Sequence, residues 1–294
     1  MQFECIDSTC AASFPIVNGI PVLINEQSSI FSIADFVAHG KPFFENVSEN
    51  RLVHTIRRLL PDTDKNIKAE SNYNRLNDIL FDQSTSPRVL VIGGSVLGLG
   101  MDSLANNPAL ELVESDVSFG PRTMLIFDAH DIPFEDESFD GVIAQAVLEH
   151  VVDPYRCSEE IYRVLNKDGV VYAETPFMQQ VHGGRYDFTR FTHLGHRRLF
   201  RKFEEIDSGA VAGPGMALAW SYKYFLLSFS TSWIIRAFIK AFTNLTTFYL
   251  KYFDHLLIDK SGTLDSASGY YFMGRKSETV LSDRELIKLY KGAG

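Results

Sequence analysis

Residues 88–100 read RVLVIGGSVLGLG, and this stretch decides the fold. It begins with four consecutive apolar residues at positions 89–92, a run typical of a buried β-strand. Glycines follow at positions 93, 94, 98 and 100. Glycine lets the backbone turn tightly and pass close to a ligand, because it has no Cβ. The stretch therefore predicts a buried strand that runs into a glycine-rich turn. The turn either holds a ligand or is an ordinary connection of an α/β fold.

After this turn, the predicted elements alternate between strands and helices. A mainly helical segment, interrupted by Pro154, is expected over residues 147–164, and Asp168-Gly169 predicts a turn. The further strands are expected at residues 110–113, 124–127, 139–143 and 170–173. This alternation predicts a doubly wound α/β fold, in which helices cover both faces of a mostly parallel sheet. Ligands of such sheets bind at the carboxyl ends of the strands.

Length, charge and cysteine content limit the class of protein. At 294 residues, the chain is long enough for one large α/β domain with additions. Its net charge of −9 argues against a broad nucleic-acid interface, which needs many Lys and Arg side chains against phosphates. The chain has three cysteines, an odd number, and its first residues show no charged stretch followed by an apolar one, the pattern of a secretory signal peptide. Both observations favour a protein of the reducing cytoplasm. No uncharged apolar run reaches the ~18 residues that a membrane-spanning helix needs.

Two acidic residues follow predicted strands at the edge where a ligand is expected. Asp116 lies 16 residues after Gly100, near the spacing at which an acid accepts hydrogen bonds from ribose hydroxyls. Asp128 follows the next strand, where a carboxylate can accept from the exocyclic amine of an adenine. A single loop aspartate is more often merely solvated, but two in register with the glycine turn predict a nucleoside site. Glu114 is an alternative to Asp116.

From residue 88 to about residue 200, the chain resembles the class I S-adenosylmethionine-dependent methyltransferases, in particular their "type 11" group. The phrase FDAHDIPFEDESFDGVIAQAVLEHV at residues 127–151 carries the resemblance. The family places D-A-x-x-L-P-F, D-x-S-F-D and L-E-H-V at the same positions. The resemblance implies a seven-stranded Rossmann-like sheet, S-adenosylmethionine as cofactor, and methyl transfer to an acceptor that is a small molecule in most of the group.

The resemblance also implies roles for individual residues. Asp116 would bind the ribose, Asp128 with Ala129 the adenine, and the glycine turn the methionine part. The residues expected at the cofactor are Gly93, Gly94, Ser95, Asp116, Asp128, Ala129 and Gln145. The family usually has an acid and a third glycine where this chain has Val91 and Ser95, so the contact to the cofactor's amino group would be made differently.

The loop at residues 178–198 is the expected acceptor side. It reads MQQVHGGRYDFTRFTHLGHRR and is dense in titratable and aromatic groups. A methyl sulfonium is already an activated electrophile, so the enzyme chiefly aligns the acceptor, excludes water and accepts one proton. That task needs no metal ion. His182 and Asp187 are the main candidates for the general base, with His150 beside the reaction centre. Packing of the aromatic residues and solvation of the charges are the alternative.

The first 27 residues predict a small hairpin, because Asn18-Gly19 separates two β-rich runs. The phrase FPIVNGIPVLI resembles half of a zinc-ribbon module that precedes some methyltransferases. Cys5 and Cys10 would be its remaining cysteine pair. A structural zinc site usually has four ligands, and this segment offers no further cysteine or histidine, so no bound zinc is expected in the monomer.

Residues 208–253 contain four cations, no Asp or Glu and both tryptophans. This composition allows contact with a membrane surface or a lipid-linked substrate. If the segment were one helix, Lys223 would lie about 140° from Arg236, so no single polar stripe would form. The alternative is that helices cap the sheet and form a wall of the acceptor pocket. Ser282 and Glu285 predict a capping box for a last helix.

The sequence thus predicts a cytoplasmic, metal-independent methyltransferase that modifies an O or N atom of a small-molecule or glycan-like acceptor. A nicotinamide-dependent oxidoreductase is one alternative, although it would be favoured by a full G-x-G-x-x-G, which is missing. A non-catalytic, methyltransferase-like binding module is another. The expected parts are an N-terminal hairpin (1–27), a helical lead-in (28–87), the core (88–207), a helical insertion (208–253), and final strands with a helix (254–294).

Overall fold

The computed structural model describes residues 2–4, 12–39 and 61–294. Its centre is a seven-stranded sheet with the order β6-β5-β4-β7-β8-β10-β9. The strands are β4 (Arg88–Ile92), β5 (Glu111–Asp116), β6 (Leu125–Ile126), β7 (Phe139–Gln145), β8 (Leu165–Pro176), β9 (Phe203–Ala212) and β10 (Gly269–Lys276). Only β10 runs antiparallel to its neighbours in this sheet. The predicted doubly wound, mostly parallel sheet is confirmed.

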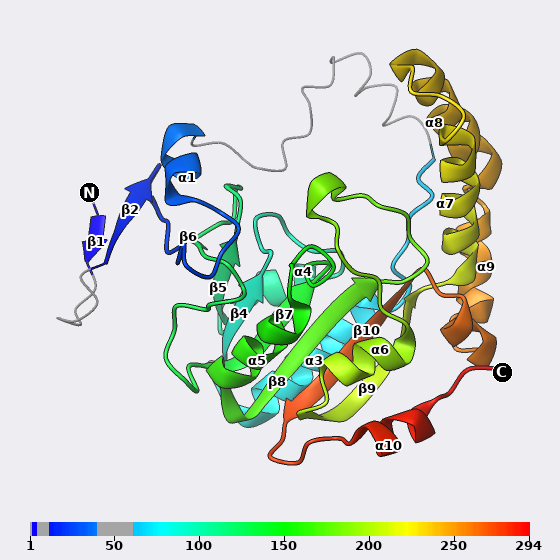
Figure 1. Ribbon diagram of the computed structural model, residues 1–294. Helices are drawn as coiled ribbons and strands as arrows, with labels where there is room; N and C mark the ends of the chain where they lie inside the picture. The colour runs from blue at the N-terminus through cyan, green and yellow to red at the C-terminus, as the bar shows by residue number, and fades with distance from the viewer. Residues whose placement is uncertain (1, 5–11, 40–60) are drawn as a thin grey trace.

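Helices cover both faces of the sheet, as Figure 1 shows. Successive side chains of a strand point to opposite faces, so Leu90 and Ile92 belong to one apolar cluster and Val89 and Val91 to the other. The first cluster includes side chains of α5 (Pro154–Val164) and α6 (His193–Leu199). The second includes side chains of α3 (Ala69–Gln83), α4 (Asp102–Ala105) and α7 (Pro214–Leu227).

Helix α5 begins at Pro154 and is not interrupted there. The Asp153 side chain accepts hydrogen bonds from the backbone N–H groups of Tyr155 and Arg156, and Pro154 occupies the first turn, where its missing N–H is harmless. The helix predicted over residues 147–164 is therefore wrong in its first part. Residues 146–153 form a loop at the end of β7, and this loop lies at the candidate site.

The N-terminal hairpin extends the edge of the sheet at β6. Strands β1 (Gln2–Glu4), β2 (Ser13–Val17) and β3 (Ile20–Pro21) form an antiparallel unit. Asn18 (φ 52°) and Gly19 (φ 83°) make its turn. The Leu23 N–H donates to the Ile126 carbonyl at 2.7 Å. Cys5 and Cys10, the cysteines of the zinc-ribbon-like segment, and residues 40–60 of the predicted helical lead-in lie outside the described residues.

The carboxyl-terminal third contains a strand that the sequence did not reveal. Residues 208–212 end β9, and the helices begin only with α7, followed by α8 (Trp233–Thr247) and α9 (Leu250–Leu257). These three helices, called the helical arm below, lie side by side at one flank of the molecule, with α7 in contact with both others. The remaining short helices are α1 (Ile33–His39), η1 (Gly184–Tyr186), η2 (Ser261–Asp265), α10 (Asp283–Leu286) with its capping box, and η3 (Ile287–Leu289).

Among the described residues, no helix combines the length and the apolar character that crossing a membrane requires.

Candidate active site

A cavity of about 320 Å³ lies at the carboxyl ends of the central parallel strands. Six residues predicted from the sequence line it: Gly93, Asp116, Asp128, Ala129, His150 and His182. They come from four different connections of the sheet and from the loop after β8, and the parallel arrangement of the strands brings them to one edge.

The glycine turn after β4 forms one wall of the cavity. Gly93 has φ 76°, and a Cβ at this position would lie 2.4 Å from Cγ2 of Val147, so only glycine fits. The two residues that follow hold the turn against β5. The Gly94 N–H donates to the Ser115 carbonyl at 2.8 Å, and the Ser95 N–H donates to Oδ2 of Asp116 at 3.1 Å. Gly94 and Ser95 are not among the described lining residues, so their observed role is to shape the turn.

Asp116 is the acid of β5 that faces the cavity. Burial raises the pKa of this carboxyl, although hydrogen bonds from Ser95 and from the backbone at Val117 and Ser118 act in the opposite direction. Glu114, the alternative, instead accepts a hydrogen bond from Nε of Arg122 at 2.6 Å. Of the two acids, only Asp116 is among the described residues that line the cavity.

Asp128, after β6, is held on both carboxylate oxygens. Oδ1 lies 2.5 Å from Nδ1 of His130, and Oδ2 accepts from the Ser29 hydroxyl at 2.5 Å. Nε2 of His130 accepts from the Asp153 N–H at 2.9 Å, so the ring proton is on Nδ1 and points to Asp128. Burial alone would raise the pKa of Asp128, but the hydrogen bonds from His130 and Ser29 outweigh it and lower the pKa. The carboxylate therefore remains an acceptor at neutral pH.

A cover over the cavity comes from the segment before α1, which the sequence did not assign to the site. Ile30 and Phe31 line the cavity, and Ser29 binds Asp128. The Phe31 ring lies 5.8 Å from the Tyr186 ring, measured between centroids, so the cover meets the loop after β8. No local pattern in residues 28–32 indicates this position, because it depends on the hairpin's attachment to β6.

Gln145 supports the glycine turn and is not among the described residues that line the cavity. Its Nε2 donates to the Leu99 carbonyl at 3.1 Å and to Oε2 of Glu174 at 3.0 Å. Glu174 also accepts from the Tyr172 hydroxyl at 2.6 Å and from Nδ2 of Asn66 at 2.9 Å. Burial raises the pKa of Glu174 to about 7. This network holds the ends of β7 and β8 beside the turn.

Asp187 fixes the shape of the loop after β8. Its Oδ2 accepts from the N–H groups of His182 at 2.8 Å and Gly183 at 3.1 Å. Arg190 forms an ion pair with the same carboxylate. Burial would raise the pKa of Asp187, but the bonds from Arg190 and the backbone dominate and lower it strongly. Asp187 is paired with Arg190 and is not among the described residues that line the cavity, so the geometry favours Asp187 as a positioning residue over Asp187 as the base.

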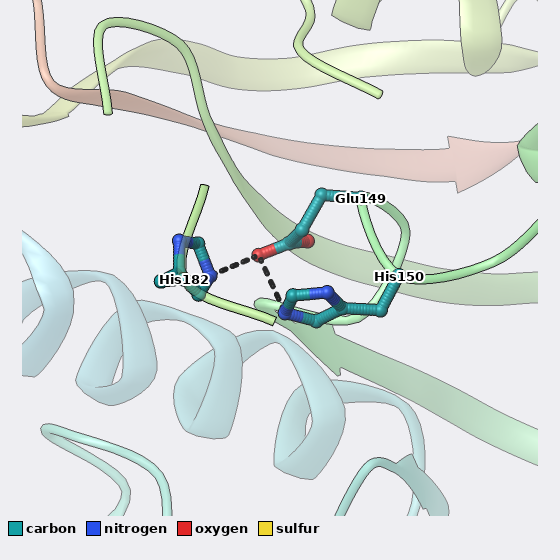
Figure 2. Close-up of side chains that lie close together, drawn as sticks. All are labelled: Glu149, His150 and His182. Atoms are coloured by element: carbon teal, nitrogen blue, oxygen red, sulfur yellow. Dashed lines mark ion pairs between the residues drawn. The ribbon is translucent and has the colours of Figure 1, made fainter. Parts of the chain in front are cut away.

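The two candidate histidines face each other across a buried carboxylate. Figure 2 shows Glu149 between His150 and His182. Oε1 of Glu149 lies 3.8 Å from Nε2 of each ring, and the ring centroids are 5.0 Å apart. The interaction with Glu149 raises the pKa of His182. Glu149 is not among the site residues predicted from the sequence. Its place in the L-E-H-V phrase, just after a buried strand, could have identified it as a candidate.

A second hollow, of about 630 Å³, lies between the loop after β8 and α7. Gln180 and Asp187 line one side, and Tyr224 and Phe225 of α7 line the other. The Tyr224 hydroxyl donates to the Val181 carbonyl at 3.2 Å, which joins the helical arm to the loop that carries His182.

Residues 94–173 match a family model described as "Methyltransferase domain". No curated protein matches the chain. Among solved structures, a candidate sarcosine dimethylglycine methyltransferase of Galdieria sulphuraria is 14% identical, with 73% of this chain and 87% of that chain covered and a TM-score of 0.47. A phosphoethanolamine N-methyltransferase 2 of Haemonchus contortus is 15% identical, with 77% and 57% covered and a TM-score of 0.46.

Proposed function

We propose that the chain, of which residues 94–173 match the methyltransferase-domain model, uses S-adenosylmethionine and transfers its methyl group to an O or N atom of an acceptor that enters beside His150 and His182. The observation that carries this proposal is the cavity. Gly93, Asp116 and Asp128 line its nucleoside side, and the two histidines line the same cavity. The acceptor class remains that of the sequence prediction, a small-molecule or glycan-like compound.

The residues around the cavity suit this chemistry. Ile30, Phe31, Val147 and Val151 make the walls largely apolar, which excludes water from the activated methyl group. The glycine turn and the two aspartates hold the nucleoside, so the sulfonium methyl can point toward the histidines. His182, with its raised pKa and its partly exposed ring, is the group we assign to accept the acceptor's proton.

Titration calorimetry tests the cofactor. S-adenosylmethionine is expected to bind one site per chain with a dissociation constant between ~1 µM and ~1 mM, the range common for enzyme substrates, and NADH is expected not to bind. NADH binding without S-adenosylmethionine binding would support the oxidoreductase. Cofactor binding without S-adenosylhomocysteine release, in a screen of sugars, lipid-linked glycans and phenols, would support the non-catalytic module.

We further propose that the helical arm contacts a membrane surface, so that the acceptor is lipid-linked or amphiphilic. An ordinary surface helix buries its apolar side chains and exposes its polar ones, whereas α8 does the reverse. Thr243 and Thr247 are buried, whereas Ile234, Phe238 and Leu245 are 50%, 74% and 55% exposed. At about 100° per residue, the three apolar side chains form one stripe on the outer face.

The charges of the arm fit anionic headgroups. Lys223, Arg236, Lys240 and Lys251 are its cations, and no acid occurs between residues 208 and 253. Lys223 lies on α7 and Arg236 lies on α8, and the chain is not helical between them. The angle of about 140° between these two side chains, expected for a single continuous helix, therefore does not describe them. Since α7 also borders the second hollow, a lipid-anchored acceptor could reach the loop of His182 from this side.

Vesicle sedimentation tests the membrane contact. We expect the chain to bind vesicles that contain anionic phospholipid, and less strongly at high salt. The double substitution Phe238→Asp with Leu245→Asp should lower the partition coefficient ~10-fold or more, because two apolar side chains no longer insert. Ile287→Asp, which changes an exposed apolar residue of η3, is the matched control and should bind like the unmodified chain. A stable dimer that leaves vesicles unbound would instead assign the apolar stripe to self-association.

A further inference from the structure

We infer that Glu149, His150 and His182 form a binding site for a divalent first-row transition-metal ion. Their ligand atoms all lie within 4.8 Å of one another (Figure 2). Two loops supply them: Glu149 and His150 lie on the loop after β7, and His182 lies on the loop after β8. The binding of the ion does not depend on the identity of the methyl acceptor.

In the described part of the chain, the Glu149 side chain is buried without a hydrogen-bond partner. It is 0% exposed, and neither carboxylate oxygen has a hydrogen-bond partner among the described residues. A buried, ionised carboxylate without hydrogen bonds is strongly unfavourable. The guanidinium of Arg190 does not satisfy it, because Arg190 is paired with Asp187. A bound metal ion beside the two Nε2 atoms would satisfy this carboxylate; a proton on a histidine or on Glu149 itself is the alternative.

The histidines present their Nε2 atoms to that carboxylate. Nδ1 of His150 lies 2.8 Å from the Tyr186 carbonyl, so this nitrogen carries the proton of a neutral ring. Its Nε2 then carries a lone pair that faces Oε1 of Glu149 at 3.8 Å, with no proton between the two acceptors. Nδ1 of His182 lies 3.3 Å from the Gln180 carbonyl and 3.5 Å from Nη2 of Arg190, so these contacts allow either tautomer of this ring. Carbonyl groups that hold the far nitrogen are the usual second shell of metal-bound histidines.

The donor set selects the class of ion. Imidazole and carboxylate ligands at ~2.0–2.2 Å suit zinc and related ions, and a tetrahedral site of this size places its ligand atoms ~3.3–3.5 Å apart. The two 3.8 Å contacts of Glu149 would therefore need to shorten by a few tenths of an ångström, and the separation of the two Nε2 atoms, which lie within 4.8 Å of each other, by up to about 1.5 Å. Three protein ligands leave a coordination position open, and His150 and His182 line the cavity where an acceptor would lie.

What the ion does for catalysis rests on the proposed function. At the open position, the ion would bind an acceptor hydroxyl and lower its pKa, so that the hydroxyl would release its proton to solvent water and its oxygen would take the methyl group, with S-adenosylhomocysteine as the leaving group. The two imidazoles would then act as ligands and not as bases. This inference departs from the sequence expectation that methyl transfer here needs no metal.

The test is a titration of the full chain, treated with a chelator and dialysed, with Zn²⁺ by calorimetry and with Co²⁺ by its visible absorption. We expect one ion per chain, and no comparable binding of Mg²⁺, which prefers oxygen ligands. Glu149→Gln, His150→Ala and His182→Ala should each weaken Zn²⁺ binding more than ~10-fold, the least that loss of a metal-supporting group usually causes. His255→Ala removes an exposed histidine of α9 and is the matched control, with unchanged binding.

Two further measurements make the outcomes distinct. Zn²⁺ should raise the unfolding temperature of the unmodified chain and of His255→Ala, but not that of Glu149→Gln, which also reports whether each variant is folded. Zinc held by the N-terminal thiols would be lost in Cys5→Ser and Cys10→Ser and retained in the three cluster variants, which overturns the inference. Absence of binding overturns it as well. Calorimetry with S-adenosylmethionine in the same metal-free sample shows separately whether the proposed function holds.

Discussion

Replacing His182 with alanine is expected to lower kcat by ~10²-fold or more, the usual contribution of a positioned proton acceptor, while the affinity for S-adenosylmethionine stays nearly unchanged. The physical reason is its place in the cavity. His182 lies on the loop after β8, where it contacts Glu149, while Gly93, Asp116 and Asp128 lie on the nucleoside side. A metal ion on the same imidazole leads to the same loss, because the ion would lose a ligand. The measurement is S-adenosylhomocysteine release with the acceptor found by screening, together with calorimetry of cofactor binding.

The pH profile separates a role as base from a role as ligand. In chelator-treated enzyme with His182 as base, kcat should fall as the pH drops below the raised pKa of His182, because the protonated ring cannot accept a proton. Glu149→Gln removes the charge that raises this pKa, so the acidic limb should move to lower pH. His255→Ala is again the matched control. Full activity of His182→Ala would show that the loop only packs, and the base would then be sought at His150 and near Gln145.

Replacing Asp128 with alanine is expected to weaken S-adenosylmethionine binding by about 1–3 kcal/mol, the penalty for leaving a buried donor unpaired. The lowered pKa of Asp128 keeps its carboxylate ionised at neutral pH, so it can accept from the adenine amine. We expect Asp116→Ala to weaken binding in the same way through the ribose. Calorimetry with S-adenosylmethionine measures both.

Asp131→Ala is the matched control for Asp128→Ala. Asp131 accepts hydrogen bonds from Asn25 and Ser28, so its loss also disturbs the segment that covers the cavity. It is not among the described residues that line the cavity, so Asp131→Ala should weaken cofactor binding less than Asp128→Ala does, and it measures how much of the loss comes from the covering segment. If Asp116→Ala and Asp128→Ala both kept full affinity, the nucleoside would have to bind elsewhere.

The positions of Gly93, Asp116 and Asp128 at one edge of the sheet could be predicted from the sequence, because they depend on short stretches around strand ends. The apolar run of β4 and the glycines after it specify a buried strand and a tight turn. Asp116 and Asp128 each follow a strand of the same parallel sheet, and the carboxyl ends of such strands must meet at one edge. The departure at Ser95 also has a local account, since its N–H binds Asp116 and holds the turn.

The loop residues were harder to interpret, because the roles of charged side chains depend on their partners. Asp187 and His182 had equal standing as bases in the sequence. In the folded chain, Arg190 and two backbone N–H groups occupy Asp187, whereas His182 faces Glu149. The neighbours of a titratable side chain in the folded chain determine its pKa and its free acceptor sites, and the sequence of the loop does not show these neighbours.

The sequence by itself determined the doubly wound sheet, the Asn18-Gly19 hairpin and the acids at the strand ends, since these follow from the spacing of residues close together in the chain. Only the tertiary structure decided which groups share the cavity. Glu149 meets His182 from another connection of the sheet, Phe31 covers the site from the N-terminal segment, and α8 turns its apolar side outward. Hydrophobic periodicity indicates that a helix has an apolar and a polar face. Elements distant in sequence determine which face packs inward, so the pattern alone could not predict the positions of Glu149, Phe31 and the apolar face of α8.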